Sequence, residues 1–157
     1  MAIEEGLSGP HLSMAFLCEK ILVEKDNVQT FVRVVERFTI PVLPKLPPEV
    51  QLPPNILVNQ LLQCNMVIGF KAGTIHGGKY HMSIRLTKPD GGQMPENKFD
   101  VFLNGSDENG VIAVLPIAIS QPEEGLHWFD VYFEGNLITR IPLRVLHQEM
   151  QRLGLPR

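Results

Sequence analysis

A glycine-rich stretch contains the residues whose spacing comes nearest to a known chemical motif. Gly73, Gly78 and Lys79 have the G-x-x-x-x-G-K spacing of a phosphate-binding loop. In such a loop a Ser or Thr follows the Lys and binds magnesium, and a helix opens there to hold the phosphate. Here Tyr80 follows, and the next residues alternate with period two. We therefore expect a connection between two strands and no nucleotide site.

Histidine and cysteine are the residue types that bind transition metals. The five histidines include no H-x-x-x-H or H-x-H pair, and Cys18 and Cys64 fall on apolar strand faces, where cysteine usually acts as a small hydrophobe. We expect no metal and no other cofactor. The serines occupy no G-x-S-x-G elbow. An enzyme with a site on a sheet face near His81 and His127 is kept as the third functional hypothesis.

Acidic loops are the next candidates. Asp107, Glu108 and Asn109 offer the oxygen ligands that calcium prefers, but they lack the D-x-[DN]-x-[DN]-G order of a calcium loop. They support an alternative function, a ligand-binding or membrane-binding sandwich with calcium at its acidic loops. Charged residues also interrupt two apolar strands, and we expect these to form a cross-strand ion-pair cluster: Glu19, Lys20, Glu36 and Arg37.

The strands that must position these residues are clearest at Leu126–Val145. Phe129, Val131 and Phe133 share the face that we assign to the core, and Trp128 and Tyr132 share the opposite face. These two aromatics are our candidate contact residues, unless another strand covers them. A two-residue Gly135-Asn136 turn would put the apolar side chains of one strand on the same face as the polar side chains of the next. We therefore predict an odd-length loop or a bulge. Pro142 requires an edge position or a bulge.

Other stretches complete a β protein. Residues 12–35 predict a hairpin whose first strand is central, because it is apolar on both faces. Residues 40–59 hold six prolines and predict a stiff crossover between two sheets, or a docking segment. Val111–Ile119 is also apolar on both faces and contains Pro116, which predicts an edge strand that either self-associates or is covered by the crossover. Leu146–Leu153 predicts a short helix.

The expected fold is therefore all-β, an antiparallel immunoglobulin-like, Greek-key sandwich of about eight strands. We expect a flexible arm at 1–11, the sandwich at 12–145 and a short helical tail at 146–157. The 157 residues suit one core, and a net charge of −3 gives no footprint for nucleic acid. Without a signal-peptide pattern, a long apolar run or a disulfide framework, we expect a cytoplasmic protein that does not span a membrane.

Three segments also resemble an uncharacterised bacterial family of small β-sandwich proteins. They are Cys18-Glu19, the strand Arg33–Arg37 that reads R-V-V-E-R, and the hairpin Phe129–Gly135 that reads F-D-V-Y-F-E-G. The resemblance implies the sandwich fold and no catalytic residues.

Our leading functional hypothesis is a non-enzymatic protein-interaction module with an unknown protein partner, which forms a homodimer through the Val111–Ile119 edge.

Overall fold

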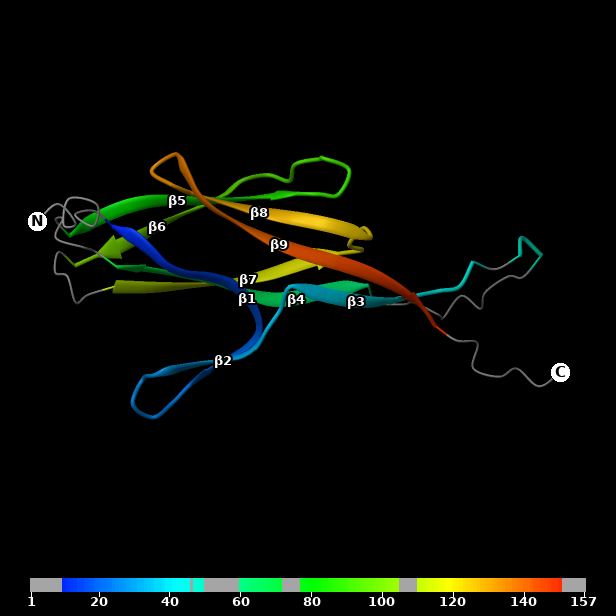
Figure 1. Cartoon of the computed structure of the whole chain (residues 1–157), viewed down its shortest axis with the longest axis horizontal. Coiled ribbons are helices and arrows are strands. Elements are labelled where there is room, and N and C mark those ends of the chain that lie inside the picture. Colours follow the sequence, from blue (N-terminus) through cyan, green and yellow to red (C-terminus); the bar gives the residue numbers. More distant parts are fainter. Residues whose placement is uncertain (1–9, 46, 50–59, 72–76, 105–109, 151–157) are drawn as a thin grey trace, which may run out of the picture.

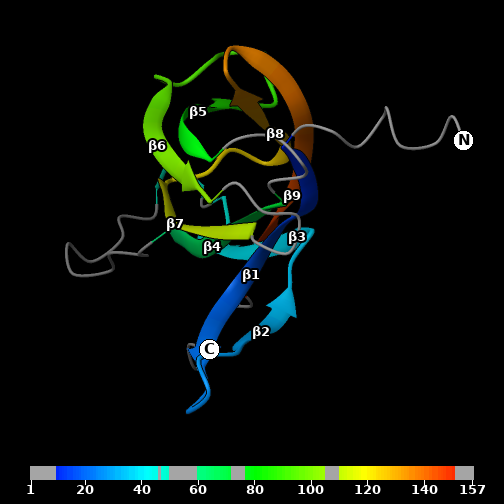
Figure 2. The same cartoon turned by 90° about the vertical axis from the view of Figure 1, so that its left-hand side faces the viewer.

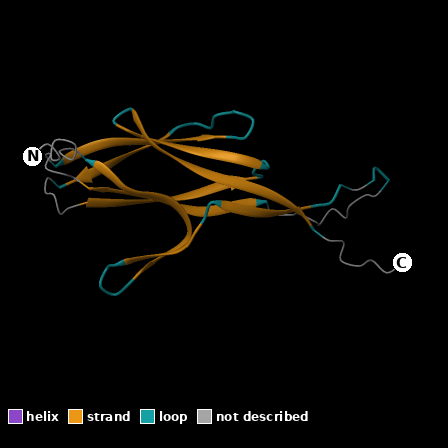
Figure 3. Cartoon of the chain, in the orientation of Figure 1, coloured by secondary structure: helices purple, strands orange, loops and turns teal. Residues whose placement is uncertain are grey.

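The computed structural model describes residues 10–45, 47–49, 60–71, 77–104 and 110–150. These residues form nine β-strands and no helix (Figure 3). The strands are β1 His11–Val23, β2 Gln29–Val34, β3 Arg37–Val42, β4 Leu61–Lys71, β5 Gly78–Thr87, β6 Asn97–Leu103, β7 Gly110–Ser120, β8 Gly125–Phe133 and β9 Asn136–Glu149. Within the described ranges, no helix is long and apolar enough to cross a membrane.

The strands form two sheets that face each other (Figures 1 and 2). One sheet has the order β2-β1-β4-β7, and the other has the order β3-β9-β8-β5-β6. The chain crosses between the sheets after β2, β3, β4, β6 and β7, which is the Greek-key connectivity expected of an immunoglobulin-like sandwich. All pairs are antiparallel except β3 with β9. The sandwich is therefore confirmed, with nine strands in the described ranges instead of about eight.

The core lies between the two sheets and follows the alternation of the strands. Each strand turns every second side chain inward, because successive side chains of a strand point to opposite faces. Phe129 and Val131 of β8 are buried, as predicted, and Phe133 packs against the core from its margin. The largest fully buried apolar side chains are those of Leu17, Leu62, Met66, Ile68, Met82, Phe129 and Leu143.

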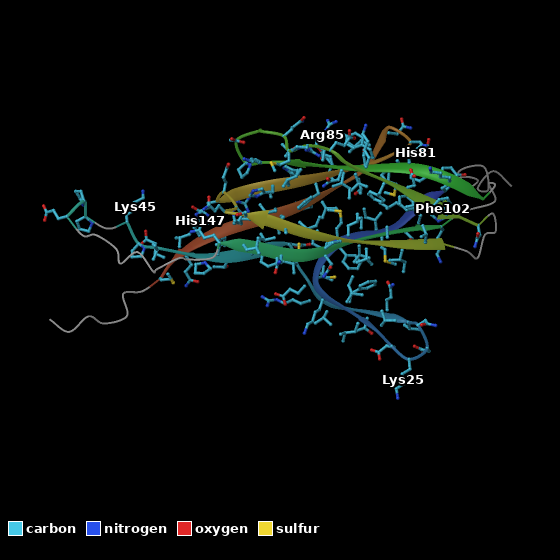
Figure 4. The ribbon with its side chains drawn as sticks, turned by 180° about the vertical axis from the view of Figure 1, so that it is seen from behind. Lys25, Lys45, His81, Arg85, Phe102 and His147 are labelled. Atoms are coloured by element: carbon cyan, nitrogen blue, oxygen red, sulfur yellow. The ribbon has the colours of Figure 1, made fainter. Side chains whose placement is uncertain are left out.

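The β1–β2 hairpin projects from the sandwich. β4 pairs with β1 only from His11 to Cys18, so beyond Cys18 the strand has β2 as its only ladder partner. Figure 1 shows this two-stranded segment bending away from the body, and Figure 4 places Lys25 at its tip. We call residues 19–34 the ribbon. β1 lies between β2 and β4, so its predicted central position is confirmed.

The β8–β9 hairpin contains the predicted irregularity. Its turn consists of Glu134 and Gly135, both with positive φ, as a type I′ turn requires. Val131 pairs with Thr139, whereas Tyr132 pairs with Leu137, so Ile138 forms a bulge that restores the matching of faces. At Pro142 only β8 pairs with β9, because the pairing with β3 begins at Arg144. The missing N–H of Pro142 therefore lies at a local edge, as the sequence requires.

Two expectations about element boundaries are wrong. The predicted helix at Leu146–Leu153 is replaced over Leu146–Glu149 by the end of β9, which pairs in parallel with residues Thr39–Val42 of β3. Backbone pairing with a distant strand outweighs a short helical pattern. Ile40–Val42, expected in the Pro-rich crossover, accordingly belong to β3. Residues 43–60 connect β3 in one sheet to β4 in the other. Most of this segment, the arm at 1–9 and the tail at 151–157 lie outside the described residues.

Candidate functional site

The outer face of the five-stranded sheet carries the predicted contact residues. Trp128 and Tyr132 point away from the core and are half-buried, and no described strand covers them. Instead, the guanidinium carbon of Arg140 lies 4.8 Å from the centre of the Trp128 ring, and that of Arg85 lies 5.4 Å from the Tyr132 ring. Both distances suit cation–π attraction. The aromatics are therefore solvent-facing and are held in place by arginines.

A carboxylate orders this arrangement. Asp130 stands between Trp128 and Tyr132 on β8 and is only 7% exposed. Its Oδ1 accepts a hydrogen bond from Nε of Arg140 at 2.6 Å, directly across the β8–β9 ladder. We call Arg85, Trp128, Asp130, Tyr132 and Arg140 the arginine–aromatic face. It combines rigid aromatic area with directed hydrogen-bond donors, which is the composition typical of binding surfaces.

A second polar group on the same sheet contains the residue types of nucleophilic catalysis. His81 Nδ1 lies 2.6 Å from Oδ1 of Asp100. The other carboxylate oxygen of Asp100, Oδ2, lies 2.8 Å from Nζ of Lys79. The hydroxyl of Ser83 donates to Glu96 and not to His81. The pKa of Asp100 is lowered, mainly by its hydrogen bond with Lys79 and next by that with His81. The pKa of Glu96 is also lowered, mainly by the hydrogen bond that it accepts from Ser83. The hydroxyl is therefore bonded to a carboxylate whose lowered pKa makes it a weak base, and not to the histidine that is the base of a serine triad.

His81 and His127 are not brought together. His81 lies on the outer face, near Arg85 in Figure 4, whereas His127 is 1% exposed and points inward on β8. The two histidines also lie at opposite ends of the β5–β8 ladder. Met82, which follows His81, pairs with Phe133, whereas Trp128, which follows His127, pairs with Thr87. The two histidines therefore do not share one sheet-face site, which the third functional hypothesis requires. His127 instead lines a cleft of about 690 Å³ between the two sheets.

The imidazole of His127 is almost fully buried at the edge of this cleft. Nδ1 of His127 is buried and has no hydrogen-bond partner. Burial lowers the pKa of His127. This outweighs the hydrogen bond with the backbone of Gly125, the carboxylate of Glu123 and the longer-range backbone contact at Leu143, which all raise the pKa, although neither backbone contact satisfies Nδ1 by strict hydrogen-bond geometry. The charge of Lys88 lowers the pKa further. The imidazole is therefore neutral near pH 7.

The four-stranded sheet exposes several apolar side chains, on β7 and on the ribbon. In β7, Ile112 and Val114 are 40% and 37% exposed, and their neighbours Val111, Ala113 and Leu115 pack on the core. The ribbon exposes more such side chains: Leu22, Val23, Val28, Val32 and Val34. We call these seven exposed residues of β7 and the ribbon the apolar surface.

A row of contacts joins the two parts of this apolar surface. Val114, Val67 and Phe16 stand side by side across β7, β4 and β1. The ring of Phe31 from the ribbon then packs edge-on against Phe16, with 5.0 Å between the ring centres. Val67 in this row is fully buried. On the ribbon, Phe31 shares its face with Val23, whereas Leu22, Val32 and Val34 lie on the opposite face.

Pro116 affects how the edge of β7 is able to pair. Gln121 N donates to Gln60 O, and the β4–β7 register has no shift, so odd-numbered residues of β7 bond to β4. The nitrogen of Pro116 therefore faces the free edge, where it cannot donate to an added strand. The predicted edge position of β7 is confirmed, but a proline stands in the middle of that edge.

The other predicted site residues are mostly separate. Glu19 pairs with Arg33 at 3.0 Å, a partner that we did not predict. Lys20, Glu36 and Arg37 take part in none of the ion pairs among the described residues, and all four predicted residues are exposed. The predicted ion-pair cluster is therefore wrong, because exposed charges need no partner. Asp107, Glu108 and Asn109 lie outside the described residues. Cys18 and Cys64 are free and buried.

Sequence reasoning missed three features of the structure, although the sequence contains evidence for two of them. His127 stands two residues before Phe129, on the face that we had assigned to the core, so its burial follows from the same alternation. Arg140 pairs across the hairpin with Asp130 once the bulge at Ile138 is known. The departure of the ribbon from the sheet has no such signal, because it depends on where β4 stops pairing with β1.

Known proteins provide a family and no function. The sequence matches the profile of a family of unknown function, DUF6941, over residues 13–146. The chain belongs to this family. The predicted resemblance to an uncharacterised family of β-sandwich proteins is thereby confirmed, although no finding tests the bacterial origin. No curated protein matches the DUF6941 chain.

Solved structures resemble this DUF6941 protein only distantly. The alkylpurine DNA glycosylase AlkC of Pseudomonas fluorescens, bound to DNA with an abasic site analogue, is 7% identical over 84% of this chain and 30% of its own, with a TM-score of 0.41. A β-glucosidase of Listeria innocua is 11% identical over 88% of this chain and 16% of its own, also with 0.41. An immunoglobulin-like protein of Pseudomonas aeruginosa is 11% identical over 88% and 98%, with 0.36. The chain thus spans less than a third of the first two proteins, and these scores support no transfer of function.

Proposed function

We propose that this protein is a non-enzymatic protein-interaction module and that its apolar surface binds a second copy of the chain. The observation that carries the proposal is the concentration of exposed apolar side chains on the ribbon and β7. Single apolar residues are normal on a protein surface, but several exposed apolar side chains gathered on neighbouring strands are typical of an interface.

The ribbon supports a protein partner in particular. An isolated two-stranded hairpin is marginally stable in water, and this ribbon exposes apolar side chains such as Leu22 and Val34 to solvent. Packing against another apolar surface stabilises it. The outer face of β7 supplies such a surface, since β7 contains no charged residue between Gly110 and Ser120. The same chain therefore carries both complementary parts.

A twofold arrangement uses both parts at once. When the ribbon of one copy packs on β7 of the other, the reverse contact forms by symmetry, and the assembly closes as a dimer. This contact uses the face of β7 and not its edge hydrogen bonds, which Pro116 interrupts. We therefore move the proposed dimer contact from the Val111–Ile119 edge to the outward side chains Ile112 and Val114.

Sedimentation velocity of three variants beside the wild type tests the proposal. We expect a dimer for the wild type at tens of micromolar, and a monomer for Leu22→Lys and for Val114→Lys, because each change places a charge in both symmetric contacts. Leu137→Lys is the matched control, since Leu137 is 51% exposed on the other sheet and Leu22 is 46% exposed. It should remain a dimer. A monomeric wild type, or a dimer in both test variants, would overturn the proposal.

The arginine–aromatic face supports contact with a different protein. Arg, Trp and Tyr are the residues most often found at binding hot spots, and here the rings are already ordered by Arg85 and Arg140. An affinity pull-down with the wild type and with a Trp128→Ala, Tyr132→Ala double variant tests this contact. A stoichiometric partner lost only in the double variant supports it, and equal recovery contradicts it. We also propose a cytoplasmic location, which two free, buried cysteines are compatible with.

A further inference from the structure

We infer that the outer face of the five-stranded sheet binds an extended segment of a partner protein in which a carboxylate side chain and an apolar side chain stand two residues apart. The carboxylate binds at Arg37 and Arg144, and the apolar side chain packs on Trp128 and Pro142. The inference rests on the protein contact proposed for the arginine–aromatic face and names the chemistry of that partner. It does not depend on the proposed dimer.

Two arginines stand side by side at one end of this face. Arg37 of β3 and Arg144 of β9 are direct neighbours in the parallel ladder. Phe38 and Leu143, which adjoin them in the chain, pack in the core. Both arginines therefore point to the opposite side of the sheet, where both are exposed. Like charges at neighbouring positions of a sheet repel each other. We call Arg37 and Arg144 the arginine pair.

Among the described residues, no ion pair neutralises the arginine pair. The ion pairs of that part of the chain include neither Arg37 nor Arg144. Glu36, which precedes Arg37, also takes part in none of them. Glu124, just before β8, uses its Oε1 to accept a hydrogen bond from the backbone N–H of His147 at 3.1 Å. The two positive charges therefore stand without a carboxylate partner in this part of the chain.

The other arginines of the face already have partners. Arg140 Nε lies 2.6 Å from Asp130 Oδ1, and a guanidinium nitrogen of Arg85 lies 4.0 Å from a carboxylate oxygen of Glu96. An added carboxylate therefore gains more at the arginine pair than at Arg85 or Arg140. A guanidinium binds a carboxylate through parallel N–H bonds, so a carboxylate at the pair also removes the repulsion between the two arginines.

Aromatic and apolar surface lies one step along the sheet from the arginine pair. Pro142 is exposed and stands two residues before Arg144 on the same face of β9. Across the ladder it pairs with Trp128, whose half-buried ring is held by Arg140. Residues two apart in a strand are about 6.7 Å apart. An extended chain along β9 therefore places alternate side chains on the arginine pair and on Trp128 with Pro142.

The charges of the whole face favour a peptide over a nucleic acid. A nucleic acid strand carries a negative charge at every nucleotide. The same sheet also bears the carboxylates of Glu96 and Asp100, and the chain has a net charge of −3. A segment with one carboxylate at the arginine pair avoids this repulsion. A small free anion would gain the arginine pair but not the contact with Trp128, which adds apolar burial.

Fluorescence anisotropy on the full chain tests the inference with two peptides. The probe is fluorescein-labelled Gly-Ser-Glu-Ser-Phe-Ser-Gly, and the matched control peptide has Gln in place of Glu. We expect the wild type to prefer the Glu peptide by about tenfold, the effect of charge-assisted hydrogen bonds. The preference should disappear in the double variant Arg37→Gln, Arg144→Gln. It should remain in Lys79→Gln, Lys98→Gln, which removes the same charge from the same sheet.

The apolar half of the segment has its own variant. Trp128→Ala should weaken the binding of both peptides several-fold and leave the preference for Glu intact, because it removes aromatic surface and no charge. Unchanged affinity in Trp128→Ala would overturn the inference. So would equal affinity of the wild type for the two peptides, a preference that persists in Arg37→Gln, Arg144→Gln, or no binding at about 1 mM protein.

Two further arms separate this inference from other partners. Tighter binding of a labelled single-stranded oligothymidylate than of the Glu peptide would assign the arginine pair to phosphates and overturn the inference. In sedimentation velocity, Arg37→Gln, Arg144→Gln should keep the oligomeric state of the wild type. A change would assign the arginine pair to a contact between copies, which also overturns it. A pull-down partner lost in Trp128→Ala, Tyr132→Ala, without a peptide preference, would leave the proposed protein contact standing and overturn only its acidic chemistry.

Discussion

Single side chains affect the stability of this protein in two measurable ways. His127 shows the first, which is a dependence of stability on pH. Burial is the largest cause of its lowered pKa, so the unfolded chain, in which the value is near 6.5, binds a proton at a higher pH than the native protein does. Stability is then fully present above pH 6.5 and falls as the pH decreases through 6.5 towards the native pKa. Urea unfolding between about pH 7.5 and 5.5 should show this loss for the wild type and a smaller loss for His127→Phe. Parallel curves for the two proteins would contradict the assignment.

Arg140 shows the second kind of contribution. Its removal leaves the carboxylate of Asp130 buried without its partner at 2.6 Å and uncovers the Trp128 ring. Because Arg140 is half-exposed, water replaces part of what is lost. We expect Arg140→Ala to lower the free energy of unfolding by about 1–2 kcal/mol. Arg144→Ala, an exposed change on the same strand, should stay within about 0.5 kcal/mol in the same denaturant titration. Equal losses would show that the Asp130 pair contributes nothing.

The residues that sequence reasoning placed well are those whose role follows from alternation alone. Phe129, Val131, Trp128 and Tyr132 lie on the predicted faces, because a strand has only two faces to choose between. Partners across strands were harder to predict. Glu19 was expected beside Lys20, Glu36 and Arg37, but its partner is Arg33, since a contact depends on register and register depends on turns and bulges.

At the scale of elements, the ribbon should be the least protected strand pair. Beyond Cys18 it has no third strand, whereas β8 and β9 lie inside a five-stranded sheet. Two-stranded structure with few buried contacts opens readily. In hydrogen exchange at about 1 µM protein, amides of residues 20–32 should exchange faster than those of 127–133. At about 100 µM, dimer formation should slow the ribbon in the wild type and not in Leu22→Lys. A ribbon as protected as β8 at the lower concentration would contradict this.

Element boundaries show where local sequence information ends. The bulge in the β8–β9 hairpin was predictable, because the apolar faces on either side of the turn do not match without an extra residue. The end of β9 was not, because Leu146, Met150 and Leu153 have helical spacing and the parallel partner, Thr39–Val42, lies a hundred residues earlier in the chain. The same dependence on a distant strand explains why β3 was read as part of the Pro-rich crossover.

For the whole molecule, the proposed dimer predicts that thermal stability depends on protein concentration. Association that involves only the native state raises the melting temperature as protein concentration increases. Between about 1 and 100 µM, the melting temperature of the wild type and of Leu137→Lys should rise by several degrees, while that of Leu22→Lys should stay constant. A melting temperature of Leu22→Lys that rises with concentration as steeply as that of the wild type would contradict the proposed dimer, because the charge at residue 22 would then not disturb the contact.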